Sequence, residues 1–293
     1  MRKNLFRAGL LAMSLSTGGA FASILPPNDL HLEDGLYRSN VSEEEFMEAI
    51  DLAEKVYAPL IKNAFNANLK VNRLWSNSTV NASASQFGRT WNVNMYGGLA
   101  RRPEVTIDGF TLVLCHELGH HLAGYPFSSS WAANEGQSDY FATLSCARLL
   151  WQDDFELNAT FRDGLPETPK QLCDEAWDAV ADQNLCYRMM AAGKSLADLL
   201  SALRNSSVSF DTPDMSRVSR TNNSHPEGQC RLDTYMAGAL CQAEFDPEFI
   251  PGKSFGSRRN SASAESESAK YTCSVLDGYE SGLRPNCWFR SVM

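Results

Sequence analysis

The chain is poor in histidine and in basic charge, and it has no long apolar run beyond its first 22 residues. It contains five histidines, and 26 lysines and arginines stand against 35 acidic residues, which gives a net charge of -9. An acidic chain of this kind is a poor candidate for binding nucleic acid or anionic lipid. Without a long apolar run there is no candidate transmembrane helix. The remaining composition, 43% hydrophobic and 21% charged, is that of a globular protein.

The first 22 residues form a predicted signal peptide. Basic residues up to Arg7 precede a moderately apolar run, and the small residues Ala20 and Ala22 come before Ser23 as at a signal-peptidase site. The apolar run is too short for a retained membrane span. The alternative is a buried N-terminal helix. We therefore expect an exported protein, periplasmic or secreted, whose mature chain begins at Ser23.

The cysteines predict disulfides. All eight follow the predicted cleavage site, and an even number in an exported chain is typical of a disulfide-bonded protein. We expect at least three pairs, with the connectivity open. Only one pair can be doubted: if residues 231–243 are helical, Cys230 and Cys241 lie about 16 Å apart, too far for a bridge.

Hydrophobic periodicity predicts an α+β fold dominated by helix. A capping box at Ser42–Glu45 starts a helix that continues to about residue 66, and two strands follow at 69–76 and 89–98. The next helix begins near Gly109 with Asp108 as its N-cap. Further helices are predicted at 134–151, 169–204 and 231–245. We expect one domain over 23–250, with a helical insertion at about 165–223, then a Ser-rich linker and a Cys-containing tail at 251–293.

The stretch LVLCHELGHHLAG, residues 112–124, holds the first candidate site. His116 and His120 are four residues apart on the predicted helix, so both imidazoles face one side and can bind one metal ion. Glu117 lies about 100° around the helix from His116, where it can act as a base instead of a ligand. The alternative is an ordinary helix with surface histidines.

Two acidic residues on the next helix strengthen the prediction of a metal site. Glu135 and Asp139 are also four residues apart, and a short loop allows their helix to fold back against the first. In an antiparallel pair, Glu135 beside His120 places Asp139 beside His116. Glu135 can then complete the metal shell, and Asp139 can orient His116 through its other ring nitrogen. The alternative is that both are ordinary acidic residues at a helix N-terminus.

The motifs together resemble the gluzincin zinc metallopeptidases, in which H-E-x-x-H is followed on the next helix by a motif similar to N-E-x-x-S-D at 134–139. The stretch SHPEGQCRL at 224–232 is similar to the H-P-x(4)-R motif of the branch that includes the CAAX prenyl proteases and HtpX-like heat-shock proteases. MYGGL at 95–99 is similar to a glycine pair of that branch. The resemblance covers roughly residues 69–242. The chain differs from typical members in its eight cysteines and its lack of a membrane helix.

The resemblance implies a zincin-like fold and one Zn²⁺ per chain, bound by His116, His120 and Glu135. Glu117 would be the general base and Asp139 the residue that supports the ligands. The resemblance also implies that His225 and Arg231 are polar groups of the active site. Two roles for His225 remain open: a donor to the oxyanion, or a fourth zinc ligand that blocks the open position. Without the resemblance, His225 would be a loop histidine and Arg231 a surface charge.

The sequence therefore predicts a zinc-dependent endopeptidase in which Glu117 activates a zinc-bound water. We expect its polypeptide substrate to join the sheet at an edge strand, residues 89–96. One rival hypothesis is a non-catalytic zinc-binding protein of adhesion or chaperone type. A second is a zymogen whose tail, 251–293, covers the cleft. His31 and His121 are interpreted as structural, and Cys115 as a disulfide or a buried thiol.

Overall fold

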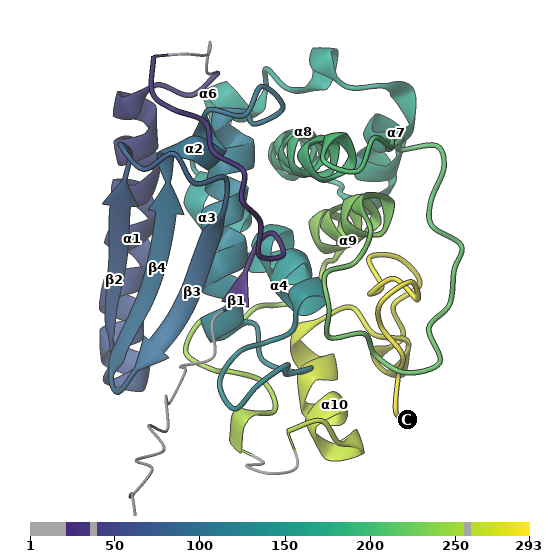
Figure 1. Cartoon of the computed structure of the whole chain (residues 1–293). Helices are drawn as coiled ribbons and strands as arrows, with labels where there is room; N and C mark the ends of the chain where they lie inside the picture. The colour runs from purple at the N-terminus through teal and green to yellow at the C-terminus, as the bar shows by residue number, and fades with distance from the viewer. Residues whose placement is uncertain (1–21, 36–39, 255–258) are drawn as a thin grey trace, which may run out of the picture.

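A computed structural model describes residues 22–35, 40–254 and 259–293 of the chain. The predicted signal peptide therefore lies outside the described residues, except for Ala22. Within these ranges the protein is α+β, as predicted: a small mixed sheet lies at one side, with helices behind and beside it (Figure 1). No helix in the described part of the chain is long and apolar enough to cross a membrane.

The sheet has four strands in the order β1-β3-β4-β2. β2 and β4 are parallel, whereas β3 lies antiparallel beside β4 and β1 antiparallel beside β3. Alternation along β4 buries Trp91, Val93 and Met95 on one face and leaves Asn92 and Asn94 half-buried on the other. One face of the sheet therefore packs into the core. The strands are β1 (Ala22–Ser23), β2 (Asn68–Leu74), β3 (Ala82–Phe87) and β4 (Thr90–Tyr96).

Helices cover the apolar face of the sheet and continue away from it. α1 and α3 pack against the sheet, and α3 contacts α4 and α8, so α3 is central (Figure 1). α4 continues through a π-helical turn into α5, in place of the single predicted helix 134–151. The helices are α1 (Glu43–Phe65), α2 (Gly97–Ala100), α3 (Ile107–Leu122), α4 (Glu135–Phe141), the π turn (Ala142–Ala147), α5 (Arg148–Trp151), α6 (Phe155–Asn158), α7 (Glu167–Ala176), α8 (Val180–Ala202), α9 (Gly228–Leu240) and α10 (Ala262–Ser268).

The expected edge strand is not at the edge. Residues 89–96 correspond to β4, which is hydrogen-bonded to β3 on one side and β2 on the other. The prediction is therefore wrong, and the reason is β3: its sequence, ASASQF, has small side chains and a weak alternating pattern. An extended substrate cannot pair with β4, because no backbone groups along this strand are left for it.

Two smaller predictions also need correction. α3 begins at Ile107 and its N-cap is Thr106, whose hydroxyl accepts the Gly109 amide at 3.0 Å. Asp108 is instead engaged by Arg188 of α8, at 2.8 Å. The region after residue 251, predicted as loop, contains the short helix α10. By contrast, the capping box of α1 is present, with both the Ser42 and the Glu45 hydrogen bond.

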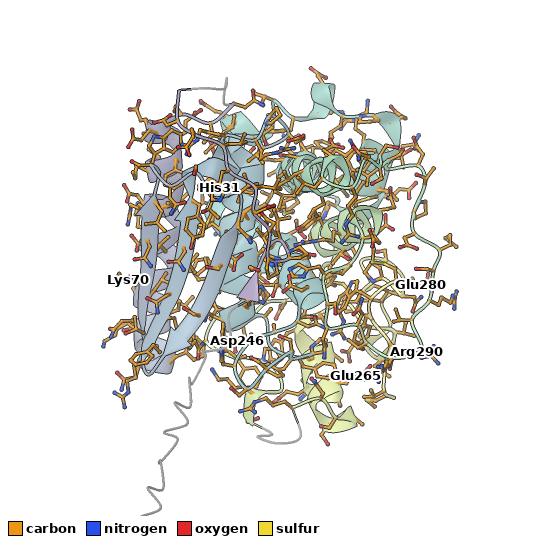
Figure 2. All side chains as sticks on the ribbon, viewed as in Figure 1. His31, Lys70, Asp246, Glu265, Glu280 and Arg290 are labelled. Atoms are coloured by element: carbon orange, nitrogen blue, oxygen red, sulfur yellow. A yellow bond between two sulfur atoms is a disulfide. The ribbon has the colours of Figure 1, made fainter. Side chains whose placement is uncertain are left out.

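The stretch 165–223, predicted as a helical insertion, contributes to the centre of the molecule. It contains α7 and α8, and α8 packs against both α3 and α9. Leu196 and Leu199 of α8 belong to the main hydrophobic core, together with Phe46 of α1 and Val93 of β4. Charged side chains lie around this core: Lys70 is on the side of the sheet and Glu280 on the opposite side (Figure 2).

All eight cysteines form disulfides, which confirms the expectation of at least three pairs. Cys230 and Cys241, at the two ends of α9, each pair with the tail and not with each other. The tail is thus attached to both ends of one helix. The pairs are Cys115–Cys146, Cys173–Cys186, Cys230–Cys287 and Cys241–Cys273.

The Arg188–Asp108 pair makes a testable contribution to stability. Arg188 is 5% exposed, donates to both oxygens of Asp108, and also binds Asp154 and Asn158. Arg188→Met leaves the Asp108 carboxylate buried without its partner, so we expect the free energy of unfolding to fall by about 3 kcal/mol or more.

Denaturant titration with the disulfides intact measures this loss. The matched control is Lys194→Met on the same helix, which removes a half-exposed pair with Asp198 and should cost about 0.5 kcal/mol. Equal losses in the two variants would contradict the role given to Arg188.

Candidate metal centre

The centre is built on the helical hairpin formed by α3 and α4. Gly119 of α3 allows the close approach, because a Cβ there would lie 2.9 Å from the Ser138 Cα. Gly124 ends the first helix with a left-handed φ of 72°, and the Ala133 amide returns to the His120 carbonyl at 3.0 Å. Asn134 then caps α4 by accepting the Gln137 amide. The two helices are therefore placed by their own local sequence.

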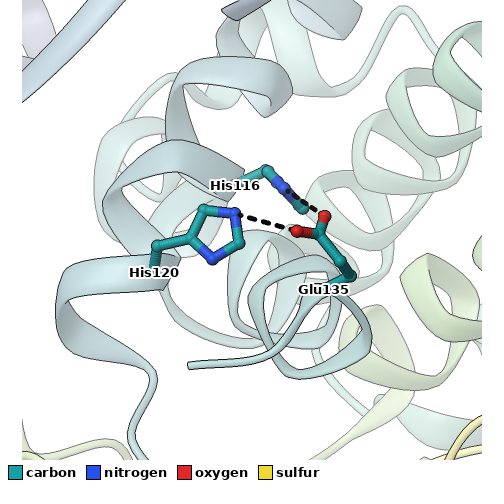
Figure 3. A group of neighbouring side chains, drawn as sticks. All are labelled: His116, His120 and Glu135. Atoms are coloured by element: carbon teal, nitrogen blue, oxygen red, sulfur yellow. Dashed lines mark ion pairs between the residues drawn. The ribbon is translucent and has the colours of Figure 1, made fainter. Parts of the chain in front are cut away.

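Three side chains on this hairpin converge on one point. The Nε2 atoms of His116 and His120 lie 3.3 and 3.7 Å from different oxygens of Glu135 (Figure 3). One donor atom from each residue lies within 4.8 Å of the other two. His116, His120 and Glu135 are thus brought together as expected from their spacing, and they could hold a metal ion.

The converging atoms have no other partner of good geometry. His116 Nε2, His120 Nε2 and Glu135 Oε2 are buried and lack a hydrogen bond within the described residues. Buried polar atoms are nearly always satisfied, so three such atoms facing one another need an explanation. A cation between them would satisfy all three at once, which makes this donor set fit a metal ion.

The outer nitrogens of both histidines are held by the protein. His116 Nδ1 lies 2.7 Å from Asp139 Oδ1, and His120 Nδ1 lies 2.9 Å from the Ala133 carbonyl and 3.0 Å from the Ser138 hydroxyl. The acceptors on Asp139 and Ala133 hold a proton on each Nδ1, so Nε2 is the ring nitrogen that each histidine turns toward the other ligands. Asp139 therefore lies where the antiparallel hairpin was expected to place it.

The protonation of these groups follows from burial and charge. Burial disfavours the charged form of His116, but the neighbouring Asp139 carboxylate outweighs it and raises the pKa to about 9. Burial lowers the pKa of His120 to about 4. Burial would raise the pKa of Glu135, yet the two histidines lower it to about 2. Glu135 is therefore an anionic ligand at neutral pH.

Arg231 is the counter-charge of Asp139. It is 0% exposed, and its Nε and Nη2 donate to the two Asp139 oxygens at 2.7 and 2.5 Å. The Tyr235 hydroxyl donates to the same carboxylate at 2.6 Å. Burial opposes ionisation of Asp139, but Arg231 and His116 together hold its pKa far below the usual range. Arg231 is thus a buried member of the site and not a surface charge.

Glu117 is fully buried beside the cluster. Burial raises the pKa of its carboxyl to about 8, against the lowering effect of His116. Neither oxygen has a hydrogen bond of good geometry among the described residues, although the Ile24 amide is close enough to favour the ionised form. A carboxyl with a pKa in this range can accept and release a proton near neutral pH.

His225 also reaches the cluster. Its Nε2 lies 3.4 Å from Glu135 Oε2 and 2.7 Å from the Ser23 carbonyl oxygen. Arg231 Nη1 donates to the next carbonyl, that of Ile24, at 2.7 Å. Sequence reasoning did not include residues 23–25 in the site; the only signal was an apolar pair, Ile24-Leu25, in a polar stretch before two prolines.

The remaining candidates lie outside the site, as interpreted. His121 is stacked between Trp91 and Trp131, and its Nε2 lies 3.2 Å from the Asn92 carbonyl. His31 is exposed and lies 3.1 Å from the Ser78 hydroxyl. Cys115 forms a disulfide with Cys146 and is not a ligand.

Asp139 is expected to strengthen metal binding without being a ligand. In Asp139→Asn the carboxylate no longer fixes the His116 ring, so we expect the affinity for a divalent metal to fall by about 10- to 100-fold. Competition with a chromophoric chelator measures it, with circular dichroism as a check on folding. Asp233→Asn, which alters a partly buried carboxylate on α9, should keep the wild-type affinity. A wild-type affinity in Asp139→Asn would refute the role.

Comparisons with protein-family profiles, with curated proteins and with solved structures give no match. The chemistry of the site is therefore inferred from the side chains of this chain.

Proposed function

We propose that the protein is a zinc-dependent endopeptidase of the gluzincin type. The observation that carries the proposal is the set of three convergent, otherwise unpartnered donors, His116, His120 and Glu135, with the buried carboxyl of Glu117 beside them. A purely structural metal site needs no base of this kind. The resemblance of the H-E-x-x-H and N-E-x-x-S-D motifs to the gluzincins supports the same conclusion.

Zinc is the metal that suits this donor set best. Two imidazoles and one carboxylate are the ligands of one class of catalytic zinc site, which keeps a fourth position open. At bond lengths of about 2.0–2.1 Å, the donors of a tetrahedral zinc ion lie about 3.3 Å apart. The separation of 3.3 Å between His116 Nε2 and Glu135 Oε2 agrees with this value, and one donor atom from each of the three residues lies within 4.8 Å of the other two.

Zinc in such a site supplies Lewis acidity, which polarises a carbonyl group and makes water more acidic. The protein supplies the remaining steps. Glu117 takes a proton from the attacking water and passes it to the leaving amine. His225 donates to the carbonyl oxygen as negative charge develops there. Arg231 holds the following carbonyl of the peptide, as it holds the carbonyl of Ile24.

The four disulfides are consistent with an oxidising compartment, since such bonds are rare where thiols are kept reduced. We propose a periplasmic or extracellular location, with an extended polypeptide as the substrate.

Glu117→Gln separates catalysis from metal binding. The amide cannot take a proton from water, so hydrolysis of casein or of a quenched peptide should become undetectable, while the protein keeps one zinc per chain. Elemental analysis measures the zinc content, and the fluorescence of the quenched peptide measures hydrolysis. Glu48→Gln, at an exposed glutamate of α1, is the control with full activity, and His120→Ala should lose both zinc and hydrolysis. Hydrolysis that survives Glu117→Gln would exclude the mechanism.

His225 is expected to act in the transition state. Its hydrogen bond to the Ser23 carbonyl supports a donor role, so His225→Ala and His225→Phe should lower kcat by about 100- to 1,000-fold with little change in KM. The other role, a fourth ligand that blocks the metal, predicts higher activity in both variants. Steady-state kinetics decides between them, and unchanged kinetics would remove His225 from the site.

A further inference from the structure

The first described segment of the chain lies across the metal centre. β1 pairs antiparallel with β3, with Ala22 opposite Ala84 and Ser23 opposite Ser83. This short strand forms the edge of the sheet and lies between β3 and α4 (Figure 1). It therefore occupies the place where an extended peptide would join the sheet, on the side that faces the metal ligands.

The Ser23–Ile24 peptide unit meets all three polar groups of the proposed mechanism. Its carbonyl oxygen lies 2.7 Å from His225 Nε2, and its amide faces Glu117. The next carbonyl, of Ile24, accepts from Arg231 at 2.7 Å. The proposed base, oxyanion donor and peptide anchor thus lie around one peptide unit, as they would around a bound substrate.

The side chains beyond this peptide unit fix the segment in place. Ile24 is 1% exposed and Leu25 is 2% exposed, and both belong to the main hydrophobic core. Asn81 accepts the Leu25 amide and donates to its carbonyl, both at 3.2 Å. The polar contacts use backbone atoms, so another extended peptide could make them. The specific element is the buried aliphatic side chain of Ile24.

We propose that residues Ser23–Leu25 are an internal pseudosubstrate that closes the cleft, and that a polypeptide substrate binds by displacing them. The proposal rests on the proposed function of the same site. It also gives a preference: the residue on the amino side of the cleaved bond is small, as Ser23 is, and the residue on its carboxyl side is a branched aliphatic that takes the pocket of Ile24. The C-terminal tail, which the zymogen hypothesis places over the cleft, makes other contacts: Trp288 packs on Gly136, and its indole nitrogen donates to the Thr234 hydroxyl.

Peptide binding tests the proposal without depending on turnover. The full chain carries Glu117→Gln, so that neither the probe nor the resident segment can be hydrolysed. The probe is a fluorescent peptide with the sequence of residues 22–27, and anisotropy gives its apparent Kd. One variant adds Ile24→Ser, which removes the aliphatic anchor of the resident segment. A second adds Ser23→Cys and Ser83→Cys, whose disulfide would lock the segment onto β3.

We expect Ile24→Ser to bind the probe at least about tenfold more tightly than the parent, because the fraction of open cleft limits the apparent affinity. The locked variant should bind at least about tenfold more weakly, and mild reduction of the new disulfide should restore the parent value. Val180→Ser, which removes an exposed aliphatic residue from α8, is the matched control and should leave the Kd unchanged.

A locked variant that binds the probe as tightly as the parent would overturn the proposal, since the segment would then lie outside the peptide's path. The same conclusion follows if the probe binds none of the variants. Mass mapping verifies the four native disulfides, and the locked variant keeps Ile24 in the core, so loss of folding in Ile24→Ser does not remove the test. Failure of the proposed function is distinct: peptide binding would respond to the lock, but no protein with Glu117 would cleave peptides.

Discussion

The buried carboxylate of Asp139 is the point on which the metal centre depends. It accepts from His116, from Arg231 and from Tyr235, three residues that come from two helices far apart in the sequence. Burying this charge is unfavourable unless all its acceptor positions are used. α3, α4 and α9 must therefore come together for the carboxylate to be tolerated, and the same assembly points His116 Nε2 at the other two ligands.

The chemistry of the site follows from that arrangement. Arg231 neutralises Asp139 and still has Nη1 free to donate to the Ile24 carbonyl. Arg231 therefore binds both the carboxylate that orients His116 and the backbone of the segment that contains Ser23 and Ile24. Glu117, by contrast, has no such counter-charge in contact, and burial leaves its carboxyl with a raised pKa. The neighbours of Asp139 thus lower the pKa of its carboxyl group, whereas burial raises the pKa of Glu117 in the same site.

Local patterns in the sequence predicted much of this and missed what depends on long-range pairing. The i, i+4 spacing of His116, His120, Glu135 and Asp139 was enough to predict the hairpin, because helix geometry fixes which side chains face one another. The position of β4 inside the sheet depends on β3, whose small polar residues give little periodic signal. The contacts of Ser23 and Ile24 involve partners about 200 residues away. No local pattern indicates such a contact, and only the HPEGQCR motif suggested that Arg231 belongs to the site.

The disulfides adjoin the metal centre along the chain: Cys115 precedes His116, and Cys230 precedes Arg231. Before oxidation these are thiols, and thiolates compete strongly with imidazole and carboxylate for divalent transition-metal ions. Once paired, all eight sulfur atoms are removed from that competition, and the histidines and Glu135 are left as the preferred donors. Whether the cysteines are oxidised before or after the chain meets the ion therefore decides which residues bind it. A chain that meets such an ion before it is oxidised would hold it on cysteines of the unfolded state, whereas a chain oxidised first offers it only the candidate ligands of the α3–α4 hairpin.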